Sequence, residues 1–321
     1  MAFYLVTGGA GFIGSNIVHF LIKKGERVRV LDNFLTGKKE NLASIRDKIE
    51  LIEGDIRNFE ICLKATKGVD YVLHQAALPS VPRSVEDPLT TSEININGTL
   101  NILLASLKNK IKRVVYASSS SIYGDSPVLP KKEEMTPSPL SPYAITKLTG
   151  EYYCKVFYQI YGLETVILRY FNVFGPCQDP TSQYAAVIPK FIRAMLKGER
   201  PIIYGDGEQS RDFTYVENVV MANILSATKK EASGKVFNIA TQKRITINEL
   251  VKEINNILNT NIKPEYASPR PGDIKHSLAD ITAAKKILGY NPKVQFREGL
   301  EKTVNWFKNK LVEGGENEIR S

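Results

Sequence analysis

TGGAGFIG, residues 7–14, follows a short apolar segment and precedes an amphipathic one, so it joins a predicted strand to a predicted helix. Gly9, Gly11 and Gly14 have the spacing G-x-G-x-x-G. Glycine at these positions permits a tight turn, close approach of the backbone to a pyrophosphate, and close packing of helix on strand. The free N–H groups of the helix N-terminus add positive potential. The stretch therefore predicts a dinucleotide-binding turn.

A carboxylate follows at the position where this kind of fold selects its cofactor. Asp32 ends the next predicted strand, about 20 residues beyond the glycines. A carboxylate there accepts a hydrogen bond from the adenosine ribose 2′-OH and repels a 2′-phosphate, so we expect NAD rather than NADP. Asp55 and the pair Ala76-Ala77 end the third and fourth predicted strands and would face the same crevice. Without the glycine motif, these residues would equally suit ordinary turns.

Strand-length apolar segments alternate with helix-length amphipathic segments through the first two-thirds of the chain, which is typical of βαβ units. Helices are predicted to begin near Phe12, Asn58, Thr90 and Pro142, the last with Ser141 as a capping residue. The predicted strands are Tyr4–Thr7, Arg27–Leu31, Glu50–Glu53, Tyr71–His74, Arg113–Ser118 and Glu164–Arg169. The fold class is therefore α/β, a Rossmann-like doubly wound parallel sheet with a smaller α/β substrate-binding lobe.

After Asn172 the alternation of helix and strand patterns gives way to predicted loops rich in proline and glycine. Helix and strand patterns return between Val216 and Ile239. This suggests a chain that crosses between two lobes. We expect residues 1–171 and 211–241 to form the NAD-binding domain. Residues 172–210 and 242–321 would form the smaller lobe at the carboxyl edge of the sheet.

Composition narrows the range of partners. The 321 residues include 43 Lys and Arg against 34 Asp and Glu, a formal charge of +9. The lysines are dispersed, so we expect no nucleic-acid ligand, although the same sign favours a nucleotide diphosphate. No apolar stretch approaches the roughly 20 residues of a membrane span, and no signal peptide is recognisable, which predicts a cytoplasmic protein. Cys62, Cys154 and Cys177 show neither disulfide nor metal-ligand spacing, so we expect reduced thiols and no metal.

Tyr143 and Lys147 are four positions apart at the start of a predicted helix, which places them on one face. A nearby ammonium favours the phenolate form of a tyrosine, so the pair predicts a base that works near neutral pH. On its own, this spacing is more often a solvated helix face. The serines at 118–121, which end the preceding strand, add hydroxyl groups at the same edge of the sheet and strengthen the catalytic interpretation.

With these motifs, the chain resembles the extended short-chain dehydrogenase/reductase family, in particular its UDP-N-acetylglucosamine/UDP-glucose 4-epimerase type, over nearly its whole length. Further matching segments are HQAA at 74–77, RYFNVFGP at 169–176, YGDG at 204–207, RDF at 211–213 and RPGD at 270–273. The NAD-binding residues that the resemblance implies are Gly8, Gly11, Phe12, Ile13, Gly14, Asp32, Asn33, Asp55, Ile56, Gln75, Ala76, Ala77, Tyr143 and Lys147.

The resemblance also implies that the smaller lobe binds a UDP-sugar. Asn172, Arg211 and Arg270 would contact the diphosphate, Asp273 the uridine ribose, and residues 187–189 the uracil. A guanidinium suits this role because it makes two charge-assisted bonds to phosphate oxygens. The implied substrate-binding residues are Ser80, Ser120, Asn172, Gln178, Ala186, Val187, Arg211, Arg270, Asp273 and Ser277. The family further implies a homodimer joined through the helices predicted at 90–107 and 142–161.

The reaction that the resemblance implies is 4-epimerisation through a transient 4-keto sugar. Tyr143 would remove the proton of the sugar 4-hydroxyl, Ser119 would hydrogen-bond the same oxygen, and Lys147 would stabilise the phenolate and bind the nicotinamide ribose. Ser120 and Ser121 stand where similar dehydratases carry an Asp-Glu pair, which argues against dehydration.

The favoured substrate pair is UDP-GlcNAc and UDP-GalNAc, with UDP-Glc and UDP-Gal as further candidates. Ser277 stands where a tyrosine in the family is associated with exclusion of N-acetyl sugars, and a small side chain leaves room for the acetamido group. Pro79 departs from the glycine of that subgroup. Three alternatives stay open: epimerisation of UDP-glucuronate or another nucleotide sugar, a net NAD-linked oxidoreductase, and a non-catalytic nucleotide-sugar-binding protein.

Overall fold

The computed structural model describes residues 1–180, 186–269 and 275–318. Its centre is a parallel sheet of seven strands in the order β3-β2-β1-β4-β5-β6-β11. In the register of the central strands, Val6 lies beside Val30 on one side and Leu73 on the other. Such apolar residues are buried because helices cover both faces of the sheet. The strands are β1 (Phe3–Thr7), β2 (Arg27–Asp32), β3 (Glu50–Glu53), β4 (Tyr71–His74), β5 (Arg113–Ser119), β6 (Thr165–Tyr170) and β11 (Val236–Ile239).

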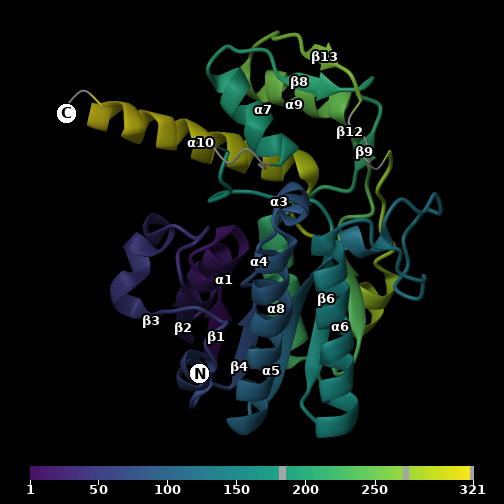
Figure 1. The fold of residues 1–321 in the computed structure, drawn as a ribbon. Coiled ribbons are helices and arrows are strands. Elements are labelled where there is room, and N and C mark those ends of the chain that lie inside the picture. Colours follow the sequence, from purple (N-terminus) through teal and green to yellow (C-terminus); the bar gives the residue numbers. More distant parts are fainter. Residues whose placement is uncertain (181–185, 270–274, 319–321) are drawn as a thin grey trace.

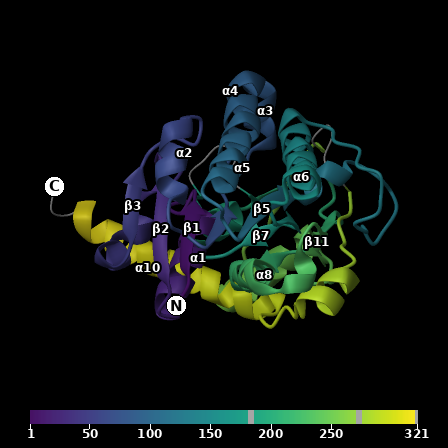
Figure 2. The ribbon, with the colours of Figure 1, turned by 90° about the horizontal axis from the view of Figure 1, so that it is seen from below.

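Helices form a layer on each face of this sheet, as the view from below shows (Figure 2). One layer contains α2 (Phe59–Thr66), α5 (Gly98–Lys108) and α6 (Pro142–Tyr161), whose buried residues share a core with the sheet. The other contains α1 (Phe12–Lys23) and α8 (Val216–Thr228). The predicted doubly wound α/β class is therefore confirmed. Among the described helices, none combines the length and apolar character that crossing a membrane requires.

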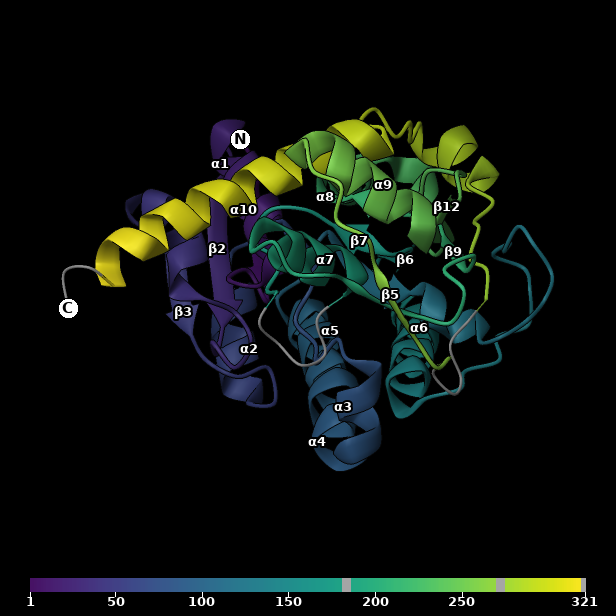
Figure 3. The same cartoon turned by 90° about the horizontal axis from the view of Figure 1, so that it is seen from above.

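The smaller lobe lies over the carboxyl ends of the strands (Figures 1 and 3). Its own core joins α7, α9 and the first half of α10 around aromatic residues such as Phe174 and Phe213. Its helices are α7 (Val187–Leu196), α9 (Ile247–Leu258) and α10 (Phe296–Glu318). Its short strand pairs are β8 (Ile202–Tyr204) with β13 (Glu265–Ala267), β9 (Ser210–Arg211) with β12 (Ile245–Thr246), and β7 (Val173–Phe174) with β10 (Thr214–Tyr215).

One segment assigned to the smaller lobe packs on the sheet of the other lobe. Residues 279–290, within the span assigned to the smaller lobe, place Ala279, Ile281, Leu288 and Tyr290 in the core cluster that covers the sheet. The proposed division, with 172–210 and 242–321 as the smaller lobe, remains a prediction; this segment connects the two cores.

The helix predicted from near Thr90 begins at Pro88 and runs to Lys108, with one π-helical turn inside it. After α3 (Val81–Glu86), α4 (Pro88–Ser92) starts at Pro88, because the Asp87 carboxylate accepts a hydrogen bond from Thr90 N at 3.0 Å. A π-helical turn, η2 (Glu93–Asn97), then separates α4 from α5. Asn58 caps α2, which begins one residue later than predicted, and β6 likewise begins at Thr165 rather than Glu164. Shorter helical segments are η1 (Lys39–Lys48), η3 (Ser120–Tyr123), η4 (Lys230–Ala232) and η5 (Ala284–Leu288).

Candidate active site

The glycine-rich turn after β1 lies where the strand order reverses direction, between β1 and β4. Gly8 has φ +66°, and a Cβ there would approach the Ala76 backbone to 2.8 Å. A Cβ at Gly14 would come within 2.1 Å of the Gly8 carbonyl oxygen. The glycines therefore allow the turn, the loop after β4 and α1 to pack together. A crevice at such a switch point is where open α/β sheets bind their ligands.

The turn fits the pyrophosphate of a dinucleotide. Gly11 is the N-cap of α1, and no side chain caps the N–H groups of the first turn. A Cβ on Gly11 would have only the Gly8 carbonyl oxygen within 4 Å, at 3.2 Å, so this face of the turn is open. Phe12, Ile13 and Gly14 form the first turn of the helix, where backbone N–H groups and positive potential favour an anion.

The acidic residues predicted at the adenosine end lie beside the turn. Asp32 ends β2, and its two carboxylate oxygens accept the N–H groups of Ala10 and Phe34, each at 2.8 Å. Burial raises the pKa of Asp32. Asn33 donates to Asp55 at 2.8 Å, and an ion pair with Arg57 lowers the pKa of Asp55. These contacts give the carboxylates defined positions at the crevice, as NAD binding requires.

The remaining predicted cofactor residues fall on the same edge. Ile56 follows Asp55 and is buried. Gln75 follows β4 and donates to Asn223 at 3.0 Å, while Ala76 N is 3.3 Å from the Thr7 hydroxyl. Ala77 is half-buried beside it. The residues present therefore fit NAD along the whole crevice.

Ser119, Tyr143 and Lys147 come together at the carboxyl edge of β5. Ser119 is the last residue of β5, and its side chain lies near enough to the Tyr143 hydroxyl to lower the pKa of that tyrosine. Lys147 is buried one turn along α6; its ammonium donates to the Ala117 carbonyl oxygen at 2.7 Å and lies 6.0 Å from the centre of the Tyr143 ring. Ser141 caps α6 by accepting from Ala144 N at 3.2 Å, as predicted. The fold thus assembles a hydroxyl, a phenol and an ammonium.

Burial shifts the pKa values of Tyr143 and Lys147 in directions that their spacing in the sequence does not reveal. It raises the pKa of Tyr143 to about 12, an effect that the nearby Ser119 hydroxyl partly offsets. Burial also lowers the pKa of Lys147 to about 8. The protein's own residues therefore hold the tyrosine as a neutral phenol, and added positive charge is needed to make it a base near pH 7.

Ser84, on α3, is a positioning residue that the sequence did not reveal. It is fully buried, and its hydroxyl accepts the Tyr143 N–H at 3.0 Å while donating to the Val81 carbonyl at 2.7 Å. The first turn of α6 needs this acceptor because Ser141 reaches only Ala144. No local pattern marks Ser84, since its partner lies 59 residues away.

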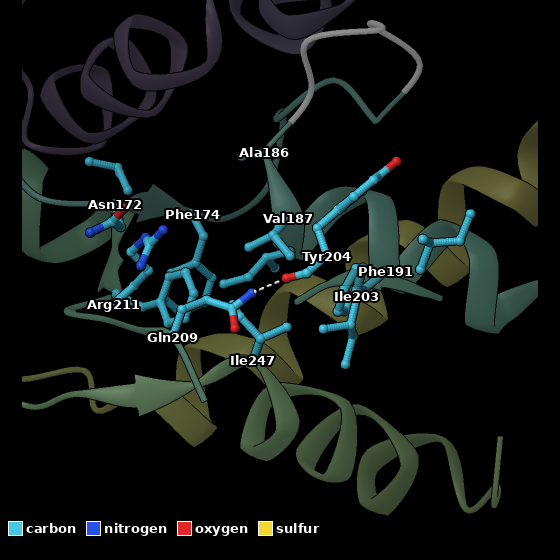
Figure 4. A pocket seen from close by; sticks show the side chains of 14 residues that line it. Asn172, Phe174, Ala186, Val187, Phe191, Ile203, Tyr204, Gln209, Arg211 and Ile247 are labelled. Atoms are coloured by element: carbon cyan, nitrogen blue, oxygen red, sulfur yellow. Dashed lines mark hydrogen bonds between the residues drawn. The ribbon is translucent and has the colours of Figure 1, made fainter. Parts of the chain in front are cut away.

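A cavity of about 330 Å³ opens among β7, α7, β8, β9 and the start of α9 (Figure 4). Asn172 and Arg211 lie together at one end of it, and apolar side chains such as Phe174 and Ile203 line the rest. Ala186 and Val187, two of the residues predicted to bind substrate, also line it. Its size and mostly apolar wall with a few polar groups suit a nucleoside.

A smaller cavity of about 50 Å³ shares Asn172 and Arg211 with the larger one. It is lined by Ser120, Tyr123, Gly124, Lys131, Phe171, Asn172, Arg211, His276 and Ser277. The predicted substrate residues Ser120 and Ser277 therefore face one space. Because the two cavities meet at an arginine and an asparagine, a diphosphate at the junction would connect a nucleoside in one to a sugar in the other.

Ser80 and Gln178, which were also predicted to bind substrate, line neither of these two cavities and make other contacts. Ser80 caps α3 by accepting from Arg83 N at 3.2 Å. Gln178 donates to the Val173 carbonyl oxygen at 3.3 Å, while its side-chain oxygen is buried without a hydrogen-bond partner. Arg270 and Asp273 lie outside the described residues.

Lys131 is a second residue that the sequence did not identify. In the sequence it begins the charged run KKEE at 131–134, which resembles a solvated surface. In the structure it is buried in the wall of the smaller cavity, and burial lowers its pKa.

Comparison with known proteins agrees with this geometry. A putative UDP-glucose 4-epimerase of Methanocaldococcus jannaschii is 43% identical over 95% of this chain and 98% of its own. A UDP-N-acetylglucosamine 4-epimerase from Methanobrevibacter ruminantium, solved with UDP-N-acetylmuramic acid, is 47% identical with a TM-score of 0.92, covering 96% of this chain and 99% of its own. The UDP-glucose 4-epimerase of Thermotoga maritima, solved with UDP-glucose, is 40% identical with a TM-score of 0.91 and the same coverage. Residues 4–240 match the model of the NAD dependent epimerase/dehydratase family, and the chain belongs to that family.

Proposed function

We propose that the protein is an NAD-dependent UDP-sugar 4-epimerase whose main substrates are UDP-GlcNAc and UDP-GalNAc. The observation that carries the proposal is that Ser119, Tyr143 and Lys147 come together at the carboxyl edge of β5, and that Ser120, the residue after Ser119, lines the smaller of two cavities that share Asn172 and Arg211. The larger cavity suits the uridine, and the residues that line the smaller one would contact part of the sugar. Free cysteines at all three positions agree with a reducing compartment, which supports a cytoplasmic location.

When bound, NAD supplies an acceptor and donor of hydride for sugar C4, together with positive charge near Tyr143. Gly8, Gly11, Asp32 and Asp55 would hold it along the crevice. Tyr143 acts as general base and takes the proton of the sugar 4-hydroxyl. It returns the proton to the same oxygen when the 4-keto sugar is reduced. The hydrogen bond from Ser119 stabilises the phenolate, and Lys147 contributes a cation while its pKa of about 8 keeps it mostly protonated near pH 7.

The acetamido group is accommodated because Ser277, rather than a larger residue, lines the sugar cavity. Ser277 N donates to the Ser210 carbonyl oxygen at 2.9 Å, so its backbone is held against β9 and its side chain has a defined place in the wall. A tyrosine ring there would occupy volume that a 2-acetamido sugar needs when it presents its other face to the cofactor.

We therefore expect Ser277→Tyr to lower kcat/KM for UDP-GlcNAc and UDP-GalNAc by at least about 100-fold while sparing UDP-Glc and UDP-Gal, because a steric clash penalises only the larger pair. Chromatographic assay of epimer formation for each sugar measures this. Equal loss for both pairs would refute the role of Ser277.

The same assay separates the reaction classes. If the wild-type protein is an epimerase, it converts a UDP-sugar into its 4-epimer without net formation of NADH. NADH is detected by its absorbance at 340 nm. Net NADH would indicate an oxidoreductase, and neither product nor NADH would indicate a binding protein.

A further inference from the structure

We propose that Lys131 gives the sugar cavity a carboxylate-binding subsite, so that UDP-hexoses carrying a carboxylate bind more tightly than their neutral counterparts. This inference rests on the proposed function, since it assumes that the smaller cavity holds the sugar. It adds a substrate class and the residue that recognises it.

The first support is the state of the Lys131 ammonium. Lys131 is 4% exposed, and its ammonium donates to the Ser126 carbonyl oxygen. An ammonium has three donors, so one carbonyl leaves most of its hydrogen-bonding capacity unused. Asp125, whose charge acts on the ammonium, is exposed and forms no ion pair with it in the described structure. A buried cation of this kind is stabilised best by an anion with accessible oxygens.

The second support is the rigid placement of Lys131 in the cavity wall. Its backbone N–H donates to the Leu278 carbonyl oxygen at 2.7 Å, and its own carbonyl oxygen accepts from Asp280 N at 2.8 Å. Asn238 donates to the same carbonyl oxygen at 2.9 Å. These bonds join Lys131 to the segment that carries Ser277, so both residues line one wall. The backbone of Lys131 is therefore held in place in the wall of the smaller cavity.

The third support is the charge of the cavity as a whole. Among the described lining residues, Lys131 and Arg211 are cationic and none is acidic. The diphosphate would meet Arg211 at the junction of the cavities, whereas Lys131 lines only the smaller one. Lys131 is therefore the cation of this wall that the diphosphate would leave unmatched, and the sugar substituent that would match it is a carboxylate.

Matched ligand pairs test the proposal and locate the carboxylate. UDP-glucuronate differs from UDP-Glc at C6, and UDP-N-acetylmuramate differs from UDP-GlcNAc by a lactyl carboxylate at O3. Dissociation constants are measured by calorimetry with NAD-loaded Tyr143→Phe protein, which lacks the proposed base and does not turn the ligands over. We expect the carboxylated member of at least one pair to bind about 10- to 100-fold more tightly, as a charge-assisted hydrogen bond predicts. The pair that shows the preference identifies the position.

Variants of Lys131 assign the preference to its ammonium. In the same background, Lys131→Met should reduce the ratio of the two dissociation constants by about 10-fold or more, and Lys131→Arg should retain most of it. Lys132→Met makes the same change in charge at the exposed neighbour and should leave the ratio as it is.

The proposal is overturned if neither pair shows a preference, or if Lys131→Met weakens both members of a pair equally. Should Lys131→Met fail to fold, the wild-type ratios and Lys131→Gln still decide between these outcomes. Turnover of UDP-GlcNAc by the wild type tests the proposed function separately, because it does not depend on the binding ratios.

Discussion

Tyr143 is half-buried, and burial of its hydroxyl raises its pKa to about 12. Among the protein groups that act on it, Ser119 lowers this pKa, because a hydroxyl that donates to the phenolate stabilises the charged form. Ser119 therefore has an effect that can be measured apart from substrate binding.

We expect Ser119→Ala to shift the rising limb of the pH profile of kcat/KM to higher pH. The base is the phenolate, so loss of the hydrogen bond raises the tyrosine pKa and reduces the fraction of active base near pH 7. Activity should fall by about 10-fold or more at pH 7 and recover in part as pH increases.

Ser121→Ala is the matched control, because the buried Ser121 hydroxyl has no hydrogen-bond partner in the described structure. Its pH profile should keep the position of the wild-type limb. A uniform loss of activity in Ser119→Ala, with no displacement of the limb, would contradict the role of Ser119.

At the scale of elements, α3 holds the first turn of α6 through Ser84. This contact decides where Tyr143 lies, since the N–H of its own backbone is the group that Ser84 accepts. A helix that carries a catalytic side chain is thereby fixed by a different helix rather than by its own cap alone.

We expect Ser84→Ala to lower kcat by about 10- to 100-fold with little change in KM, because small displacements of a catalytic group are costly while the cavities stay intact. The free energy of unfolding should fall by about 1–3 kcal/mol, owing to the unsatisfied N–H. Steady-state kinetics and urea unfolding measure both quantities. Ser106→Ala removes a buried helical hydroxyl without a hydrogen-bond partner and controls for packing. A change in KM alone would rule out the positioning role.

At the scale of the whole molecule, we propose a homodimer that forms through α6 and its neighbour α5. Ile145, Tyr152, Val156 and Ile160 are 51%, 54%, 39% and 71% exposed and follow one another along one side of α6. Leu104 on α5 adds to this apolar surface. A row of this kind on a folded protein indicates an interface with a partner.

We expect light scattering to give twice the mass of one chain for the wild type and the mass of one chain for Val156→Glu at micromolar concentration. The glutamate would place an unpaired charge at the centre of an apolar interface, which costs several kcal/mol. Asn256→Glu adds the same charge on an exposed position of α9 and should leave the dimer intact. A monomeric wild type, or a dimeric Val156→Glu, would disprove this interface.

The sequence alone determined the features that depend on neighbouring residues. The glycine turn of residues 7–14, the start of α6 at Pro142 and the strands β1 to β5 follow from local spacing, capping and apolar pattern. The NAD preference follows from one more residue, Asp32, at a fixed distance from that turn. The helix predicted at 90–107 is present, but the π-helical turn at Glu93–Asn97 was not predicted, because the apolar pattern runs through it unchanged.

Tertiary structure decided which distant side chains meet. Lys131 stands in the charged run KKEE, and pairing with the segment at 278–280 buries it in the wall of the smaller cavity. Ser84 and Tyr143 are brought together only when α3 packs on α6. The physical reason is that burial and hydrogen-bond partners depend on how elements stack, and burial in turn sets acidity. The residues of the catalytic group could be named from the sequence, but their pKa values and their supports could not.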